Sequence, residues 1–116
     1  MQLPLQITFR NLDASEAVEA KIRARADELD HHFDRITGCR VAVEAVNPRD
    51  HKGRLYRVRV DLTVPGAEIV VNHAPSEDRS HEDIYVAVRD SFDAARRRLE
   101  DYVRRRRGET KTHAAP

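Results

Sequence analysis

Residues 55–64 form a segment in which apolar and polar side chains alternate with a two-residue period from Tyr56 to Val64. Successive side chains of a strand point to opposite faces, so this pattern predicts a strand with one buried face and one face in water. A sheet that is covered on one face needs helices on that face, which predicts a two-layer fold. The alternating apolar residues are Tyr56, Val58, Val60, Leu62 and Val64.

Three more segments are typical of strands. Residues 3–10 also alternate, and residues 40–46 and 67–72 are short valine-containing runs. The polar stretch NPRDHKG and the turn Pro65-Gly66 separate the last three strands. Four strands are therefore expected.

Two segments have apolar residues at helical spacing. The first helix is expected over residues 15–33, with Asp13 or Ser15 as its cap and Gly38 closing it. The second is expected over residues 83–107. Their apolar stripes are Val18, Ile22, Ala26, Leu29 and Phe33 in the first, and Ile84, Val88, Phe92, Ala95, Leu99 and Tyr102 in the second.

The order of elements is β-α-β-β-β-α, and the length of 116 residues suits one α+β domain, expected over residues 1–107. Two helical stripes and one apolar sheet face place both helices on the same side of a four-stranded sheet. The first two strands flank a helix and are expected to be parallel neighbours, which makes the sheet mixed. Residues 108–116 lack apolar periodicity and are expected to form a flexible tail.

The sequence argues against several classes of function. No apolar run approaches the roughly 18 residues of a membrane span, and no secretory signal opens the chain, so a cytoplasmic protein is expected. The single cysteine, Cys39, is interpreted as a small core residue. His31 and His32 are adjacent and lack metal-ligand spacing. Without a phosphate-binding glycine loop or a nucleophile signature, we expect no enzyme activity, metal, cofactor or small-molecule substrate.

Positive charge is concentrated in the second helix. Residues 95–107 contain seven arginines and two acids, an excess of five positive charges in a chain whose formal net charge is +1. Pairs at i,i+4 spacing, such as Glu100 with Arg104, would neutralise part of it and leave a solvated surface. The positive charge that remains unpaired favours binding to a polyanion, with RNA as the first candidate. Arg97 and Arg104 point away from the apolar stripe, and the flanking arginines are Arg89, Arg96, Arg98, Arg105 and Arg107.

A second basic segment comprises Lys52, Arg54, Arg57 and Arg59. Arg57 and Arg59 are expected on the open face of the sheet, opposite the helices, so they need not share a surface with Arg97. A second contact surface and an ordinary solvated sheet face both remain open.

The motifs SEAV at residues 15–18, FDRI at 33–36 and HEDIYVAV at 81–88 occur in this order before the helix with Arg97 and Leu99. This set resembles the hibernation-promoting factor and ribosome-associated inhibitor family, in its short form. The resemblance implies a fold similar to double-stranded RNA-binding domains. It also implies binding to 16S-type rRNA of the small ribosomal subunit and of the whole ribosome, near the decoding centre, where the protein blocks tRNA and mRNA during slow growth or stress.

The resemblance carries over to individual positions only in part. Arg25 and Arg97 match basic positions of the family's helices. Residues that are not basic stand at four positions where relatives often have lysine or arginine, namely Glu19, Glu28, Ala94 and Asp101. The expected rRNA-binding residues are Arg25, Arg89, Arg96, Arg97, Arg104, Arg105 and Arg107.

Two other functions remain open: an RNA-binding module of the same fold with a non-ribosomal target, and a protein-interaction domain whose arginines meet an acidic partner. The four departures from the family pattern support the former. The free protein is expected to be a monomer. Tyr85 and Tyr102 are expected to pack in the core rather than stack on bases.

Overall fold

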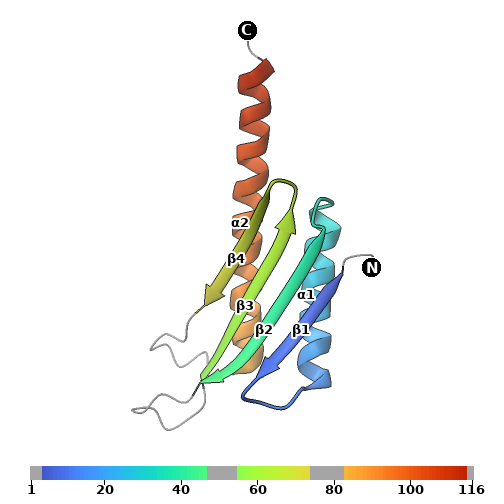
Figure 1. Ribbon diagram of the computed structural model, residues 1–116, viewed down its shortest axis with the longest axis vertical. Coiled ribbons are helices and arrows are strands. Elements are labelled where there is room, and N and C mark those ends of the chain that lie inside the picture. The colour runs from blue at the N-terminus through green and yellow to red at the C-terminus, as the bar shows by residue number, and fades with distance from the viewer. Residues whose placement is uncertain (1–3, 47–54, 74–82, 115–116) are drawn as a thin grey trace.

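The computed structural model describes residues 4–46, 55–73 and 83–114, which form a four-stranded sheet with both helices on one face (Figure 1). The predicted order of elements and the α+β class are confirmed. The strands are β1 (Leu5–Arg10), β2 (Gly38–Val46), β3 (Leu55–Val64) and β4 (Ala67–His73), and the helices are α1 (Glu16–His32) and α2 (Ile84–Ala114).

The strands lie in the order β1-β2-β3-β4. As predicted, β1 is parallel to β2, with Ile7 opposite Val41, and α1 forms the crossover between them. The pairs β2–β3 and β3–β4 are antiparallel, with Val43 opposite Val58 and Val60 opposite Val71. The sheet is therefore mixed.

The core lies between the sheet and the two helices. Val58, Val60 and Leu62 of β3 have no exposed surface, which confirms the predicted buried face of this strand. Full burial of such aliphatic side chains contributes about 1.5–3 kcal/mol each. The helices cover this face with Val18, Ile22, Ala26 and Leu29 of α1 and with Ala87, Val88, Phe92, Ala95 and Leu99 of α2.

Two buried core residues, Ser91 and Cys39, carry an oxygen or sulfur atom in the side chain. Ser91 of α2 is fully buried, and its Oγ donates a hydrogen bond to the carbonyl oxygen of Val58 at 3.1 Å. Cys39 is also buried, which confirms its interpretation as a core residue. Burial, and to a lesser extent the charge of Asp61, raises the pKa of the Cys39 thiol to about 12.

The helix ends differ in part from expectation. Ser15 rather than Asp13 caps α1, because its side chain accepts a hydrogen bond from the backbone N–H of Val18 at 3.3 Å. Phe33, in an extended conformation, ends the same helix, and its N–H still donates to the carbonyl of Leu29. The prediction that Gly38 closes α1 is wrong, since Gly38 is already the first residue of β2.

Helix α2 continues to Ala114, past its predicted end at Arg107. A glycine inside a helix costs about 1 kcal/mol relative to alanine. This cost does not end α2 at Gly108. Figure 1 shows the C-terminal part of α2 projecting beyond the sheet. The flexibility expected for residues 108–116 stays a prediction.

Candidate nucleic-acid interface

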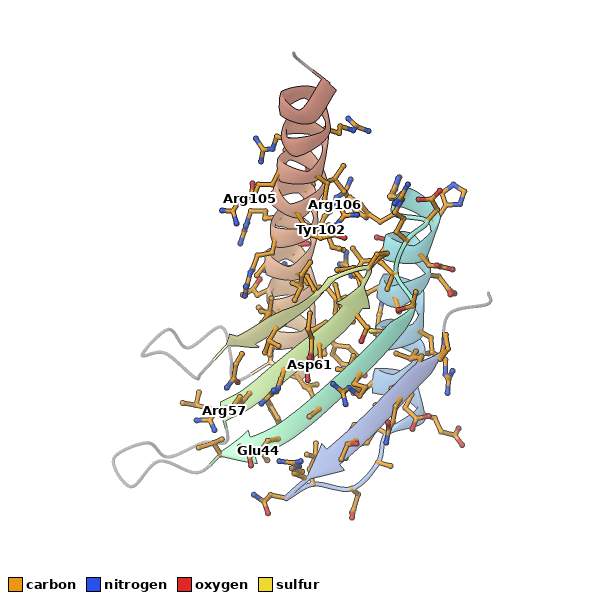
Figure 2. All side chains as sticks on the ribbon, turned by 45° about the horizontal axis from the view of Figure 1, so that its top comes forward. Glu44, Arg57, Asp61, Tyr102, Arg105 and Arg106 are labelled. Carbon is orange, nitrogen blue, oxygen red and sulfur yellow. The ribbon has the colours of Figure 1, made fainter. Side chains whose placement is uncertain are left out.

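The seven arginines of residues 95–107 differ in what they contact, and two of them face the protein itself. Arg98 donates a hydrogen bond from Nη1 to the carbonyl oxygen of Val70 in β4. The guanidinium carbon of Arg106 lies 5.7 Å from the centre of the Tyr102 ring, in cation–π geometry. Figure 2 shows Arg105 and Arg106 pointing to different sides of α2.

Two more of these arginines are paired with carboxylates of the same helix. Arg96 lies 4.0 Å from Glu100, and Arg104 donates a hydrogen bond to the carboxylate of Asp101. The expected pairing of Glu100 with Arg104 is therefore wrong, because each acid pairs with a different arginine. All four side chains are at least half exposed, so each pair contributes at most a few tenths of a kcal/mol.

Arg97, Arg105 and Arg107 are exposed, and within the described ranges no carboxylate forms an ion pair with them. We call the exposed set Arg96, Arg97, Arg104, Arg105 and Arg107 the α2 arginine surface. Its unpaired members keep their full charge and five donors each for an external anion.

The other two predicted contact residues are Arg25 on α1 and Arg89 on α2, and they differ in how close they lie to this surface. Arg25 of α1 forms an ion pair with Glu28 at 3.8 Å. Arg25 and Arg96 line the same crevice between the two helices, so the structure brings Arg25 to the α2 arginine surface. Arg89 lies about two helical turns before Arg96 and pairs with the neighbouring Asp90 at 3.2 Å.

The open face of the sheet carries a network of six charged side chains, here called the sheet network. Arg57 pairs with Glu44 across β2 and β3 at 3.2 Å. Asp61 accepts from Arg59 at 2.9 Å and lies 3.6 Å from Arg40. Arg40 also reaches Glu68 of β4 at 2.9 Å. Figure 2 shows Glu44, Arg57 and Asp61 along this face.

The sheet network contains three arginines and three carboxylates, so its formal charge cancels. The hydrogen bond to Asp61, together with its charge, raises the pKa of Arg59. Arg57 and Arg59 therefore have internal partners, whereas Lys52 and Arg54 of the same predicted surface lie outside the described residues. The role of this face in binding stays a prediction.

The four departures from the family pattern have different surroundings. Glu28 and Asp101 neutralise the neighbouring Arg25 and Arg104. Glu19 lies in the first turn of α1, where a carboxylate is favoured by the helix dipole. Ala94 is half-buried against the core.

The two tyrosines of α2 differ from each other. Tyr102 packs against the core and donates a hydrogen bond to the carbonyl oxygen of Pro65 at 2.6 Å, which confirms its predicted packing. Tyr85 is 43% exposed, so the prediction that it packs in the core is wrong. Ile84 packs against the core at the start of α2, and the backbone N–H of Tyr85 donates to the carboxylate of Asp83 at 2.9 Å.

The described residues show no sign of a metal site or of a membrane-spanning helix. Among them, no three histidine, cysteine, aspartate or glutamate side chains gather as a metal site requires. None of the described helices combines the length and apolar character that crossing a bilayer demands. The α2 arginine surface is the candidate site.

Fold and site together define a small two-layer α+β domain with an arginine-rich helix on its surface. The chain belongs to the family described as "Sigma 54 modulation protein / S30EA ribosomal protein", whose model matches residues 5–107. It is 29% identical over 100 residues to the "Ribosome hibernation promotion factor" of Deinococcus radiodurans, covering 86% of this chain. That match spans only 49%, about half, of the Deinococcus protein.

A second relative is the "Ribosome hibernation promoting factor" of Azotobacter vinelandii, 28% identical over 86 residues that cover 74% of this chain and 69% of the relative. Two solved structures share the fold. A ribosomal subunit interface protein from Coxiella burnetii has a TM-score of 0.67 and 19% identity, with 84% of this chain and 94% of the other covered. The N-terminal domain of Thermus thermophilus Protein Y has a TM-score of 0.63 and 22% identity, with coverage of 90% and 98%.

Proposed function

We propose that the protein is a ribosome hibernation factor that binds rRNA of the small subunit, in free subunits and in whole ribosomes. The observation that carries this proposal is the set of unpaired, exposed arginines Arg97, Arg105 and Arg107 on α2. Bidentate guanidinium groups are suited to phosphate, and phosphate contacts supply most of the affinity of nucleic-acid binding. The family and the names of both relatives support a ribosomal partner.

In this proposal the protein binds near the decoding centre and acts by occupancy, without catalysis. It blocks tRNA and mRNA during slow growth or stress, and it does so as a cytoplasmic monomer. A double-stranded RNA-binding type of fold recognises the backbone and shape of RNA rather than its sequence, which fits a fixed site on structured rRNA. The acidic outer residues of α1 then set the limits of the contact area, since they repel phosphate.

Co-sedimentation with separated small subunits, large subunits and whole ribosomes over a salt series tests the proposal. We expect saturable binding of one protein per small subunit, which weakens as salt rises. Arg97→Glu with Arg105→Glu should abolish it, because two free cations become anions. Both side chains are exposed, so this variant should melt like the wild type.

Competition distinguishes the alternatives. Bound protein should prevent tRNA and mRNA from binding to small subunits if it lies near the decoding centre. No binding to ribosomes at low salt, or binding to large subunits alone, would sink the ribosomal proposal. Capture of other RNA would then favour a non-ribosomal target, and binding that survives ribonuclease would favour an acidic protein.

A further inference from the structure

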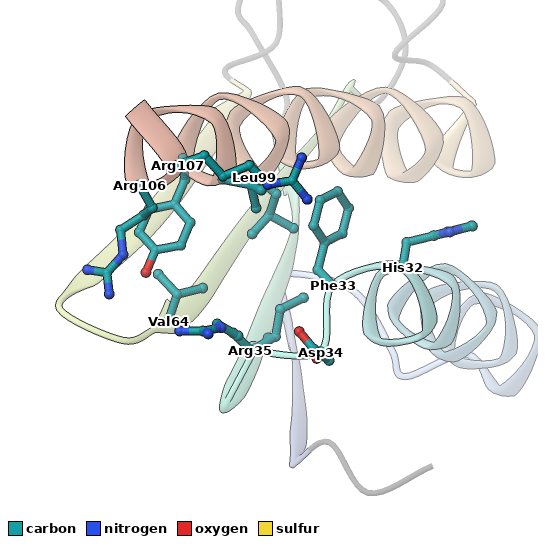
Figure 3. A pocket seen from close by; sticks show the side chains of 11 residues that line it. His32, Phe33, Asp34, Arg35, Val64, Leu99, Arg106 and Arg107 are labelled. Carbon is teal, nitrogen blue, oxygen red and sulfur yellow. The ribbon is translucent and has the colours of Figure 1, made fainter. Parts of the chain in front are cut away.

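A pocket of about 600 Å³ opens between the α1–β2 connection, the end of β3 and α2 (Figure 3). It opens to solvent, because His32, Asp34, Arg35, Arg106 and Arg107 on its rim are exposed. Its apolar lining consists of Phe33, Ile36, Val64, Leu99, Tyr102 and Val103.

Two of these lining residues are aromatic and only partly buried. Phe33 leaves α1 in an extended conformation at the C-cap, which places its ring at the pocket opposite α2. The Tyr102 ring is held in place from two sides, by its hydroxyl bond to Pro65 and by Arg106 above its face. Arg106 covers a face of Tyr102, so the Phe33 ring is the flat surface that the pocket offers to a planar ligand.

The polar rim of the pocket is cationic. His32, Asp34, Arg35, Arg106 and Arg107 surround the apolar lining, which gives three guanidinium groups against one carboxylate. Arg35 and Arg107 are exposed and approach from opposite walls, one from the α1–β2 connection and one from α2 (Figure 3). A ligand that suits this site has a flat apolar body and an anionic group.

We propose that this pocket binds one unpaired nucleotide of an RNA strand, with the base against Phe33 and its phosphate between Arg35 and Arg107. Stacking of bases on aromatic side chains together with cationic contacts to phosphate is a general mode of single-strand recognition. The inference rests on the proposed function, since it names the form of RNA that this domain contacts. It adds a base-binding site to a surface that otherwise contacts only backbone.

An RNA strand fits the pocket better than a free nucleotide does because the rim is continuous with the α2 arginine surface. Arg107 belongs to both, and Arg104, three residues earlier, lies on the same side of α2. Phosphates on either side of a captured nucleotide would meet these residues. A free nucleotide would leave them unused.

The test compares two short ribose-phosphate strands of equal charge, one fully abasic and one with a single central adenine. Fluorescence anisotropy at low salt should show roughly tenfold tighter binding of the adenine strand, as expected for one stacked base. Val103→Met should occupy part of the pocket without adding an aromatic ring, and it should reduce this preference toward one. Val86→Met is the matched control, because Val86 is also half-buried on α2 but does not line the pocket.

A second measurement needs no variant. Replacing the adenine with 2-aminopurine should give fluorescence quenching on binding if the base stacks in the pocket. Equal affinity for the two strands without quenching would overturn the inference. If free AMP binds as tightly as the adenine strand, the assignment to RNA is overturned in favour of a free nucleotide.

Failure of this inference and failure of the proposed function are separable. Loss of the adenine preference with unchanged co-sedimentation would remove the base pocket and leave the ribosomal function intact. An adenine preference without ribosome binding would support the base-binding pocket and contradict the ribosomal function.

Discussion

The open face of the sheet and the outer side of α2 both carry arginines, and they differ in what those arginines contact. In the sheet network three guanidinium groups meet three carboxylates at 2.9–3.6 Å. On α2, Arg97, Arg105 and Arg107 have no such partner in the part of the chain that the structure describes. The number of arginines in a segment therefore does not by itself predict a binding surface, and we expect binding where the arginines lack an internal partner.

The geometry of each element explains this difference. Cross-strand neighbours on one face of a sheet lie about 5 Å apart, so acids and bases on β2, β3 and β4 meet side by side. On a helix, side chains three or four positions apart are the usual partners. Residues 95–107 supply only two acids for seven arginines, so acids within the segment can neutralise the charge of at most two of these arginines.

The largest expected effect comes from removing two arginines from each region. Arg97→Ala with Arg105→Ala should weaken binding to small-subunit rRNA on the order of 30-fold near 0.1 M salt, because each lost phosphate contact removes close to one unit from the salt slope. Arg57→Ala with Arg59→Ala removes the same charge from paired positions and should change affinity less than about twofold. Filter binding over a salt series measures both. Equal losses would contradict the distinction between paired and unpaired arginines.

The next effect comes from opening the sheet network. Asp61 is only 9% exposed and contacts both Arg59 and Arg40, so Asp61→Asn should lower the free energy of unfolding by about 1.5 kcal/mol. The two arginines lose their shared carboxylate, and low-salt RNA affinity should rise modestly. Urea unfolding and filter binding measure these changes. Unchanged stability would mean that the network contributes nothing to the fold.

Tyr102 separates packing from binding on α2. Tyr102→Phe removes the hydrogen bond to Pro65 and keeps the ring, so thermal unfolding should show a loss of about 1 kcal/mol. Affinity for rRNA should stay the same, because the hydroxyl is directed to the protein. A large affinity loss without a stability change would instead assign Tyr102 to RNA contact.

The smallest expected effect concerns the buried thiol beneath the sheet network. The pKa of Cys39 rises from 9.0 to about 12 on folding, so above pH 9 the unfolded chain loses the thiol proton first. This contribution to stability is present below pH 9 and is lost as the pH approaches 12, with about 0.4 kcal/mol lost at pH 9 itself. Urea unfolding at neutral pH and at pH 9, compared with Cys39→Ala, measures it. Rapid thiol labelling of the native protein would contradict the burial.

Much of the fold could be predicted because its signals are periodic. The alternation in β3 gave its bounds and its buried face, and the stripe of Val18, Ile22, Ala26 and Leu29 gave α1. Helix ends were harder, since Asp13 and Ser15 are both good caps and only the chain path selects one. The predicted end of α2 at Arg107 rests on the lack of apolar periodicity in residues 108–116, yet the helix continues past Gly108, whose cost is small within an otherwise favourable helix.

The candidate site was less predictable because it depends on contacts between elements. The sequence identifies Arg57 and Arg59 as basic, but their pairing with Glu44 and Asp61 requires the register of β2 and β3. The pocket that we propose for a base is formed by Phe33, Val64 and Tyr102, which come from three separate segments. The exposed position of Tyr85 lacks a sequence signal, since its neighbours on both sides are apolar.

The parallel pairing of β1 with β2 has a consequence for how the chain reaches this structure. Leu5 lies opposite Cys39, whereas Val64 and Ala67 pair across a short turn. Closing the longer loop costs about 2 kcal/mol more in chain entropy than closing the shorter one, so the β3–β4 hairpin should form early and β1 late. The strand β1, which leaves the translating ribosome first, is therefore expected to join the sheet last. Its half-buried Leu5, Ile7 and Phe9 lack a neighbouring strand until β2 has been synthesised.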